Sequence, residues 1–302
     1  MAAGGINRTY LLYRGGAALL RLLPRRLVLF LGAAGGRLAA RRAPERRRAV
    51  AANLAHVLGD GGAPRADDPR LEALVTEAFV QYGRYWAVTA RLSRRDGRGI
   101  DRRVTIEGRE HFELFRSSSV LYALPHLGVW ECGGFWCVRQ GLDLTTVVEP
   151  ASTERLSEFF TKVRSALGLQ VLALGPRTAT ELLSVLEGRG SVALVADRDL
   201  VGDGLEVDFF GATTRLPGGP ALLALRSGAP LVPVGTYLQP DGGIRLAFLA
   251  PLDTARRGRL RDDVRRVTAD LAGAFEGLIA RDPAQWHVFQ PNWPADAPLE
   301  GA

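Results

Sequence analysis

Cysteine, lysine and long uncharged apolar runs are all scarce in this chain of 302 residues. The two cysteines, Cys132 and Cys137, lie in one short segment, and neither their number nor their spacing indicates a disulfide framework or a metal site. Lysine occurs once, at position 162, so arginine carries the positive charge. A hydrophobic share of 47% excludes a wholly disordered chain. We therefore expect a globular protein without a metal, in a reducing cytoplasm.

The positive charge is concentrated at the N-terminus. Residues 1–48 hold eleven arginines and one acid, Glu45, which gives this segment a net charge of +10. The whole chain carries +7, so the remaining residues sum to −3. Arginines alternate there with Leu, Val and Phe, and the longest uncharged run, Leu27 to Gly36, is about half of the ~20 residues that a spanning helix needs. The run lacks the small-residue cleavage site of a signal peptide. We predict helices that break near Pro24 and lie in an anionic membrane interface.

Two other interpretations of the basic segment remain open. Nucleic-acid binding is disfavoured, because the arginines are interleaved with large aliphatic side chains rather than gathered on a hydrophilic face. A helical hairpin that packs on the body of the protein with a solvated basic rim is the second alternative. Our expectation is a peripheral protein of the inner membrane's cytoplasmic face, with an anionic lipid surface and no nucleic acid as partner.

Three zones follow one another along a chain that we expect to form a single domain: basic amphipathic helices over 1–48, further helices over 49–101, and an α/β body over 102–302. In the body, short apolar β-branched runs alternate with helical patterns, and a hairpin turn is expected at Asp241–Gly243. We predict an α/β fold with a mixed central sheet flanked by helices. The expected strands are 118–124, 143–149, 169–174, 191–197, 205–210, 230–238 and 244–252; the expected helices are 128–140, 152–168, 178–190, 217–228 and 262–280.

The stretch "LYALPHLGVWECGG" places the two titratable groups His126 and Glu131 after a buried strand. Ligands of open α/β sheets bind beyond the carboxyl ends of the strands. Positions i and i+5 are about 140° apart on a helix, so these side chains can meet only if His126 precedes the helix and Glu131 lies in its first turn. Pro125 favours that arrangement. A carboxylate on one ring nitrogen would leave the other free as a general base; a core histidine beside a solvated glutamate is the alternative.

A second strand ends in "ADRDL", which places Asp197, Arg198 and Asp199 at the same kind of position. Two carboxylates and an arginine after an apolar strand are costly unless they have partners or water. Asp197 could complete the relay to His126 while Arg198 holds an anion. The alternative is an Asp–Arg pair at the surface, which would contribute little.

Further substrate-binding candidates lie elsewhere in the body. Free N–H groups at the helix start of "LPGGP", residues 216–220, suit a phosphate or an oxyanion. Arg164, with Glu149 before it, is a candidate anion contact or a solvated helix residue. Cys132 is disfavoured as a nucleophile, because an apolar helix raises a thiol's pKa. The apolar turn and the polar residues before the glycine-rich helix start complete the set of candidates: Phe209, Phe210, Gly211, Thr214 and Arg215.

Several blocks taken together resemble a known family. "PHLGVWE", "ADRDL", "EVDFFG", "LPGGPALLALRSGAPLVPV" and "QWHVFQPNW" occur in the order seen in the bacterial lysophospholipid acyltransferase-like superfamily. The chain is most similar to the branch that holds the lipid A late acyltransferases and the actinobacterial phosphatidylinositol mannoside acyltransferases. The mannoside acyltransferases more usually have Glu where this chain has Asp197. The side chain here is one methylene shorter, so the sequence leaves open whether Glu131 or Asp197 approaches His126 more closely.

The resemblance implies a reaction. His126 would deprotonate a mannose hydroxyl of a phosphatidylinositol mannoside, which attacks the thioester of acyl-CoA, a co-substrate; no cofactor is implied. Glu131 and Asp197 would orient His126, and Arg164 or Arg198 would bind a phosphate. A lipid A precursor or another lipid as acceptor, an acyl carrier protein as donor, thioester hydrolysis, and a non-catalytic lipid-binding protein are the alternatives.

Overall fold

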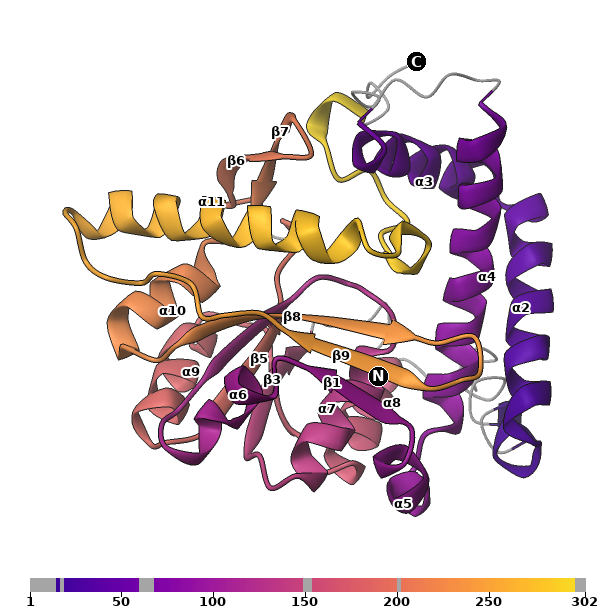
Figure 1. The fold of residues 1–302 in the computed structure, drawn as a ribbon, viewed down its shortest axis with the longest axis horizontal. Coiled ribbons are helices and arrows are strands. Elements are labelled where there is room, and N and C mark those ends of the chain that lie inside the picture. The colour runs from indigo at the N-terminus through magenta and orange to yellow at the C-terminus, as the bar shows by residue number, and fades with distance from the viewer. Residues whose placement is uncertain (1–14, 17–18, 60–67, 149–153, 200–201, 297–302) are drawn as a thin grey trace, which may run out of the picture.

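The computed structural model describes residues 15–16, 19–59, 68–148, 154–199 and 202–296, and these form a sheet between helical layers with a helical N-terminal region beside it (Figure 1). The seven strands of the sheet have the order β1-β9-β8-β2-β5-β3-β4. Only β8 and β9 pair antiparallel; the other neighbours are parallel. The predicted α/β fold with a mixed sheet is thus confirmed. The strands are β1 (Val104–Glu107), β2 (Leu121–Leu124), β3 (Leu144–Val148), β4 (Gln170–Ala173), β5 (Ser191–Val195), β8 (Leu231–Leu238) and β9 (Ile244–Phe248).

Both faces of the sheet are covered, which explains why its strands are apolar without interruption. Alternate residues of β2 enter two separate cores: Leu121 and Ala123 lie in one, Tyr122 and Leu124 in the other. The first core is formed with α9 (Thr178–Glu187), α10 (Gly219–Ser227) and α11 (Leu260–Ile279). The second is formed with α7 (Trp130–Arg139), the segment after α8 (Glu154–Ala166), and the short helices α5 (Gly97–Asp101) and α6 (Arg109–Phe112).

The N-terminal helices are α2 (Arg25–Arg42), α3 (Pro44–Val57) and α4 (Pro69–Arg91). Pro24 precedes α2, as the predicted break requires. Figure 1 shows α2 and α4 side by side, and glycines allow this close approach. A Cβ atom on Gly36 would collide with the backbone of Phe79, and one on Gly83 with the backbone of Gly32. In the part of the chain that the structure describes, no helix has the length and apolar character needed to cross a bilayer.

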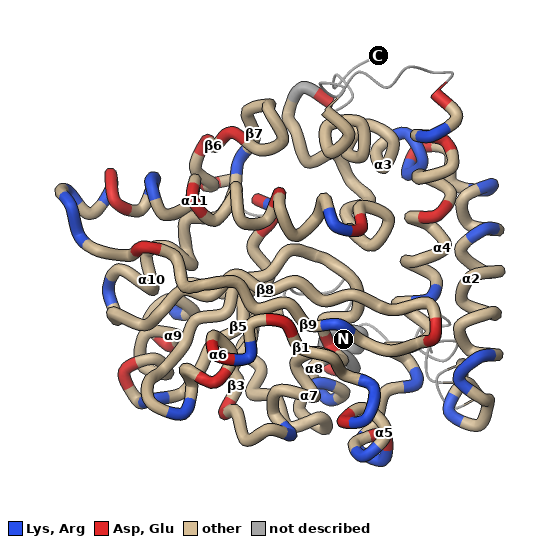
Figure 2. Tube along the Cα trace, viewed as in Figure 1, with Lys and Arg blue, Asp and Glu red and all other residues tan. Residues whose placement is uncertain are grey.

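The charges of α2 are of one sign. Figure 2 shows basic and no acidic positions along this helix, and Leu27, Phe30, Leu31 and Leu38 on it are exposed. Spacings of three, four and eight residues place these side chains along one side of a helix. The helix therefore combines a stripe of exposed apolar side chains with arginines as its only charged residues.

Two elements of the body differ from the sequence-based expectation. A strand at Val104–Glu107 was not predicted, because its alternation of half-buried and exposed residues extends over only four positions. The segment from Thr213 to Arg215 was expected to lead directly into a helix, but it lies in β7 (Ala212–Leu216). This strand pairs antiparallel with β6 (Leu205–Phe209) in a hairpin separate from the main sheet. Phe210 and Gly211 form its turn and both have positive φ.

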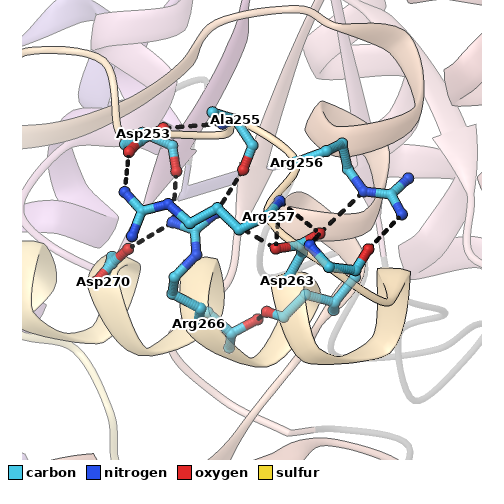
Figure 3. Close-up of polar contacts among 10 residues, drawn as sticks. Asp253, Ala255, Arg256, Arg257, Asp263, Arg266 and Asp270 are labelled. Carbon is cyan, nitrogen blue, oxygen red and sulfur yellow. Dashed lines mark hydrogen bonds and ion pairs between the residues drawn. The ribbon is translucent and has the colours of Figure 1, made fainter.

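A buried acid, Asp263, is hydrogen-bonded to the segment that precedes α11. Asp263 accepts hydrogen bonds from the Arg256 side chain at 2.9 Å and from the backbone N–H of Arg257 at 3.1 Å. Arg266 lies 3.8 Å from the same carboxylate and also donates to the Ala255 carbonyl at 2.9 Å (Figure 3). An acid in the first turn of a helix is favourable to the helix dipole. The network holds the strand-to-helix connection against the first turn of α11.

Candidate active site

The register between β2 and β5 brings His126 and Asp197 together. These strands are parallel neighbours, and Leu124 lies opposite Val195. Each of the two site residues comes two positions after its strand's last paired residue, so both lie at the same level beyond the carboxyl edge of the sheet. The Nδ1 atom of His126 is 2.6 Å from Oδ1 of Asp197, and the His126 backbone N–H donates to Oδ2 at 2.9 Å.

The loop after β2 holds the imidazole before the helix begins. Leu127 donates to the carbonyl of Pro125 at 2.7 Å, Gly128 has a φ of 63°, and α7 starts only at Trp130. A side chain at position 128 would collide with the carbonyl of Thr236, so the turn requires glycine. The predicted position of His126 on a loop in front of a helix is confirmed. The Trp130 ring meets the imidazole edge-to-face, with 5.6 Å between their centroids.

Asp197 is fully buried and remains a carboxylate because three donors surround it. The third, beside the two from His126, is the indole N–H of Trp286 at 2.7 Å. Burial alone would raise the pKa of Asp197, but the charge of His126 and these hydrogen bonds outweigh it and hold the pKa below its usual value. With Nδ1 tied to this carboxylate and the side chain 21% exposed, the neutral form of His126 presents Nε2 outward as an acceptor.

The segment after α11 is hydrogen-bonded to the loop that carries His126. The sequence analysis predicted no role for individual residues of this segment. His287 donates its backbone N–H to the His126 carbonyl at 2.7 Å, and Gly128 donates to the Gln285 carbonyl at 2.9 Å. Asn292 donates to the Asp197 carbonyl at 3.3 Å. A polar and aromatic run, "QWHVFQPNW", after the last helix was the available signal, because buried indole and amide groups need hydrogen-bond partners.

The expected hydrogen bond between Glu131 and His126 is wrong. Glu131 does lie in the first turn of α7, but its Oε1 accepts from the Tyr85 hydroxyl at 3.0 Å and from Arg164 at 2.9 Å. The other oxygen, Oε2, is buried and has no hydrogen-bond partner. The side chain turns away from the loop toward α4 and α8, and the segment after β5 supplies the carboxylate for His126. Asp197, despite its shorter side chain, is the closer partner.

His126 faces a groove of about 840 Å³. Arg164, Arg198 and Asp199 line it too, so the structure gathers four of the predicted site residues at one surface. The glycine-rich start of α10 also lines the groove, at Gly218 and Gly219. Most of the wall is aliphatic and comes from β3, β5, α9, α10 and the segment after β4: Val147, Leu174, Leu182, Leu194, Leu222 and Leu223.

Two of these charged residues also have internal roles. Arg198 donates to the Gln290 side chain at 2.8 Å, and Asp199 accepts from the backbone of Gly202 at 2.8 Å and of Gly204 at 2.9 Å. Asp199 thus shapes the loop after β5 as well as the groove wall.

The remaining predicted residues are not part of the groove. Phe209 is buried in the core, and Phe210 and Gly211 form the hairpin turn. Thr214 is buried and donates to the Asn292 carbonyl, and Arg215 pairs with Glu206 at the surface at 3.2 Å. None of these five lines the groove, so their predicted contact with substrate finds no support in this placement. Glu149 lies outside the described residues.

A narrow pocket of about 100 Å³ adjoins the groove between the sheet and α7. Four residues line both spaces: Trp130, Val147, Arg164 and Val195. The hydrogen-bonded pair of Glu131 and Arg164 therefore lies at the junction of the two. The pocket walls are otherwise largely apolar and include Leu144, Leu169, Ala193 and Phe248.

Among the described residues, the groove has no serine or cysteine that could serve as a nucleophile. Both cysteines are buried and unpaired on α7. Burial raises the pKa of each thiol to about 12, so neither supplies a thiolate near neutral pH. The arrangement suits a base that activates a hydroxyl of a bound molecule.

Comparison with known proteins gives consistent results. The profile of the bacterial lipid A biosynthesis acyltransferases matches residues 6–294. A phosphatidylinositol mannoside acyltransferase of Mycolicibacterium smegmatis is 37% identical over 291 residues, which cover 94% of this chain and 91% of that protein. One from Mycobacterium tuberculosis strain H37Rv is 38% identical over 294 residues, covering 94% and 88%.

Among solved structures, the 1-acyl-sn-glycerophosphate acyltransferase PlsC from Thermotoga maritima is similar, with a TM-score of 0.39 and 14% identity. The alignment covers 85% of this chain and 99% of that one. A likeness this distant says nothing about chemistry.

Proposed function

The chain belongs to the bacterial lipid A biosynthesis acyltransferase family, and from this premise we propose that it transfers a long-chain acyl group from acyl-CoA to a mannose hydroxyl of a phosphatidylinositol mannoside. The names of the two mycobacterial relatives support this acceptor. The observation that carries the proposal is the imidazole of His126, tied at Nδ1 to the buried Asp197 and exposed to a long apolar groove.

In the proposed reaction, Nε2 of His126 takes the proton of the acceptor hydroxyl as the oxygen attacks the thioester carbonyl. The carbon–sulfur bond then breaks, and the protonated His126 returns its proton to the thiolate of CoA. Asp197 orients the imidazole and stabilises the imidazolium that forms in between. The products are the acylated glycolipid and free CoA.

Glu131 has a different part in this proposal. It is a positioning residue that holds Arg164 at the junction of groove and pocket, since both partners are largely buried at 2.9 Å. Arg164 and Arg198, with the start of α10, provide the positive charge and N–H donors for phosphates of CoA or of the acceptor.

The acyl chain is proposed to extend into the narrow pocket beside α7. Burying each methylene there would contribute about 0.8 kcal/mol to binding. The larger groove leaves room for the polar parts of donor and acceptor near His126.

The acceptor lipid is membrane-bound, and the proposed site of action is the cytoplasmic face of the plasma membrane. Exposed Leu and Phe side chains on α2, surrounded by arginine, support peripheral attachment to an anionic surface.

The test is an assay with radiolabelled palmitoyl-CoA against phosphatidylinositol mannosides, lipid A precursors, lysophospholipids and water. The wild type should label the mannosides. His126→Ala and Asp197→Asn should each lower the rate about 10²- to 10⁴-fold. Asp208→Asn, which alters an exposed acid on β6, is the matched control and should retain full activity.

Each alternative gives a distinct result in this assay. Labelling of a lipid A precursor alone would replace the acceptor, and release of palmitate without an acceptor would indicate a thioesterase. Absence of any turnover by the wild type would indicate a lipid-binding protein. Full activity of His126→Ala would disprove the assignment of the base.

A further inference from the structure

Three arginines from distant parts of the sequence surround a small cavity away from the groove. Arg25 begins α2, Arg91 ends α4, and Arg103 precedes β1. All three line a cavity of about 20 Å³, which is also bordered by Cys132 on α7. None of these three arginines lines the groove.

Each of these arginines has an unused donor. The Nε–H groups of Arg25, Arg91 and Arg103 are buried without a hydrogen-bond partner. Buried N–H groups are nearly always paired, and an arginine cannot become neutral to avoid the cost. The Nε–H groups of Arg245 and Arg266 are unpaired too, but each of those two arginines has a carboxylate within 3.4 Å. Three such donors at one cavity therefore indicate an acceptor that normally lies between them.

The positive charge at the cavity is only partly compensated. Among the described residues, Asp96 is the only acid that lines it, at 3.8 Å from Arg91, and its other oxygen already accepts from Ser93. Residues 1–18, which precede the cluster in sequence, contain neither Asp nor Glu. Burial lowers the pKa of Arg25, and the nearby charges of Arg103 and Arg91 lower it further.

A second arginine-lined groove, of about 580 Å³ between α2, α4 and the β8–β9 turn, differs in this respect. Asp241 and Asp282 lie among its arginines. Arg84 pairs with Glu77, and Arg245 with Glu107. Acids of the protein balance much of its charge, and one of its arginines, Arg245, has a buried Nε–H without a partner, against three at the smaller cavity.

We propose that the cavity between Arg25, Arg91 and Arg103 binds a phosphate group. Its volume suffices for one or two water-sized groups, which suits the free oxygens of a phosphate whose remainder stays outside. Guanidinium groups are the preferred partners of phosphate oxygens. The phosphate could belong to a lipid headgroup, since the exposed Leu27 and Phe30 follow on α2, or it could be inorganic.

Such a site would join three elements that the chain connects only indirectly. An anion shared by the start of α2, the end of α4 and the segment before β1 would fix the N-terminal helices to the body. It would also lie against Cys132, the neighbour of Glu131. The inference is independent of the proposed acyl transfer, because binding is measured without turnover.

The test measures thermal unfolding of the full chain in gluconate buffer at constant ionic strength, with inorganic phosphate added. Saturating phosphate should raise the midpoint by roughly 2–4 °C. Arg103→Gln should lose this rise. Arg98→Gln, which removes an equal charge from an exposed position on α5, is the matched control and should keep it. An equal rise in Arg103→Gln and the wild type would overturn the proposal.

The source of the phosphate is distinguished by a parallel titration with dihexanoyl phosphatidylglycerol below its micelle concentration. A larger rise than with phosphate at equal concentration assigns the site to a lipid headgroup, whereas a rise with inorganic phosphate alone assigns it to the free anion. No rise with either probe contradicts the proposal.

A measurement on the wild type avoids dependence on a folded variant. Selenate is a tetrahedral oxyanion with anomalous scattering. In a crystal soaked with selenate, an anomalous peak between the three arginines is expected, and a cavity that holds only water would contradict the site.

Discussion

The two acids that the sequence associated with His126 have separate tasks. Asp197 is enclosed by His126 and Trp286, and it makes the direct contact of 2.6 Å. Glu131 binds Tyr85 and Arg164 instead. Burial raises the pKa of Tyr85 well above its usual range, and the charge of Glu131 raises it further, so the phenol stays a hydrogen-bond donor. Asp197 therefore contacts the proposed base His126 directly, whereas Glu131 holds Arg164 in the wall of the groove.

His287 makes the fold sensitive to acid. Burial lowers its pKa to about 3, and the neighbouring charge of His126 adds to this. In the unfolded chain the imidazole titrates near 6.5, so between about pH 3 and 6.5 the unfolded state binds one more proton and stability falls as pH falls. From pH 7.5 to pH 5, this residue should lower the free energy of unfolding by about 2 kcal/mol.

Urea denaturation of the wild type and of His287→Phe at pH 5, 6 and 7.5 checks this. The variant keeps an aromatic ring near Tyr82 and Tyr85 and should lose the acid-dependent decrease. His111→Gln, at a half-buried histidine of α6 far from His287 in sequence, serves as the control and should show the wild-type slope. An unchanged slope in His287→Phe would refute the assignment.

The helix α2 contains two neighbouring glycines in opposite surroundings. Gly36 lies against the backbone of Phe79 on α4, whereas a Cβ on Gly35 would meet nothing within 4 Å. Gly36→Ala should therefore reduce the free energy of unfolding by about 1–3 kcal/mol through overpacking. Gly35→Ala should raise it by about 0.5–1 kcal/mol, because alanine favours a helix. Chemical denaturation compares the two; equal effects would show that α2 does not pack as closely as described.

The outward side of α2 is where we predict contact with the membrane. Phe30 is 64% exposed, and Phe30→Gln should weaken binding to vesicles with anionic lipid about tenfold. Added salt should weaken the variant and the wild type alike, because the arginines remain. Leu58→Gln, at a 44% exposed leucine after α3, is the control in a sedimentation assay. Wild-type binding by Phe30→Gln would place the contact elsewhere.

At the scale of the whole molecule, the acyl chain's length should depend on residues that no single segment contributes. The narrow pocket is built from β2, β3, β5, α7, β8 and β9, with Ala193 on its β5 wall. Ala193→Leu adds three carbons there. It should lower kcat/KM for palmitoyl-CoA about 10- to 100-fold, equivalent to two or three unburied methylenes, and leave lauroyl-CoA nearly unaffected.

Steady-state kinetics with the two donors tests this prediction. Ala39→Leu on the exposed side of α2 makes the same chemical change away from the pocket and should alter neither donor's kinetics. An equal loss for both chain lengths in Ala193→Leu would mean that the pocket does not hold the end of the chain.

The sequence by itself determined what depends on neighbouring residues. The order of strands and helices in the body follows from apolar periodicity, and the break before α2 follows from Pro24. The position of His126 on a loop follows from Pro125 and from the geometry of a five-residue spacing. These are local constraints of the backbone and of short patterns, so they can be derived from a few adjacent residues.

Only the tertiary structure decided which distant groups meet. Asp197 reaches His126 because β5 lies next to β2 in matching register, and strand order is not encoded in either strand. Trp286 and the three arginines around the small cavity are likewise placed by chain segments far apart in sequence. Such contacts arise when whole elements bury their apolar faces together, because the packing of entire layers then sets the position of each polar side chain.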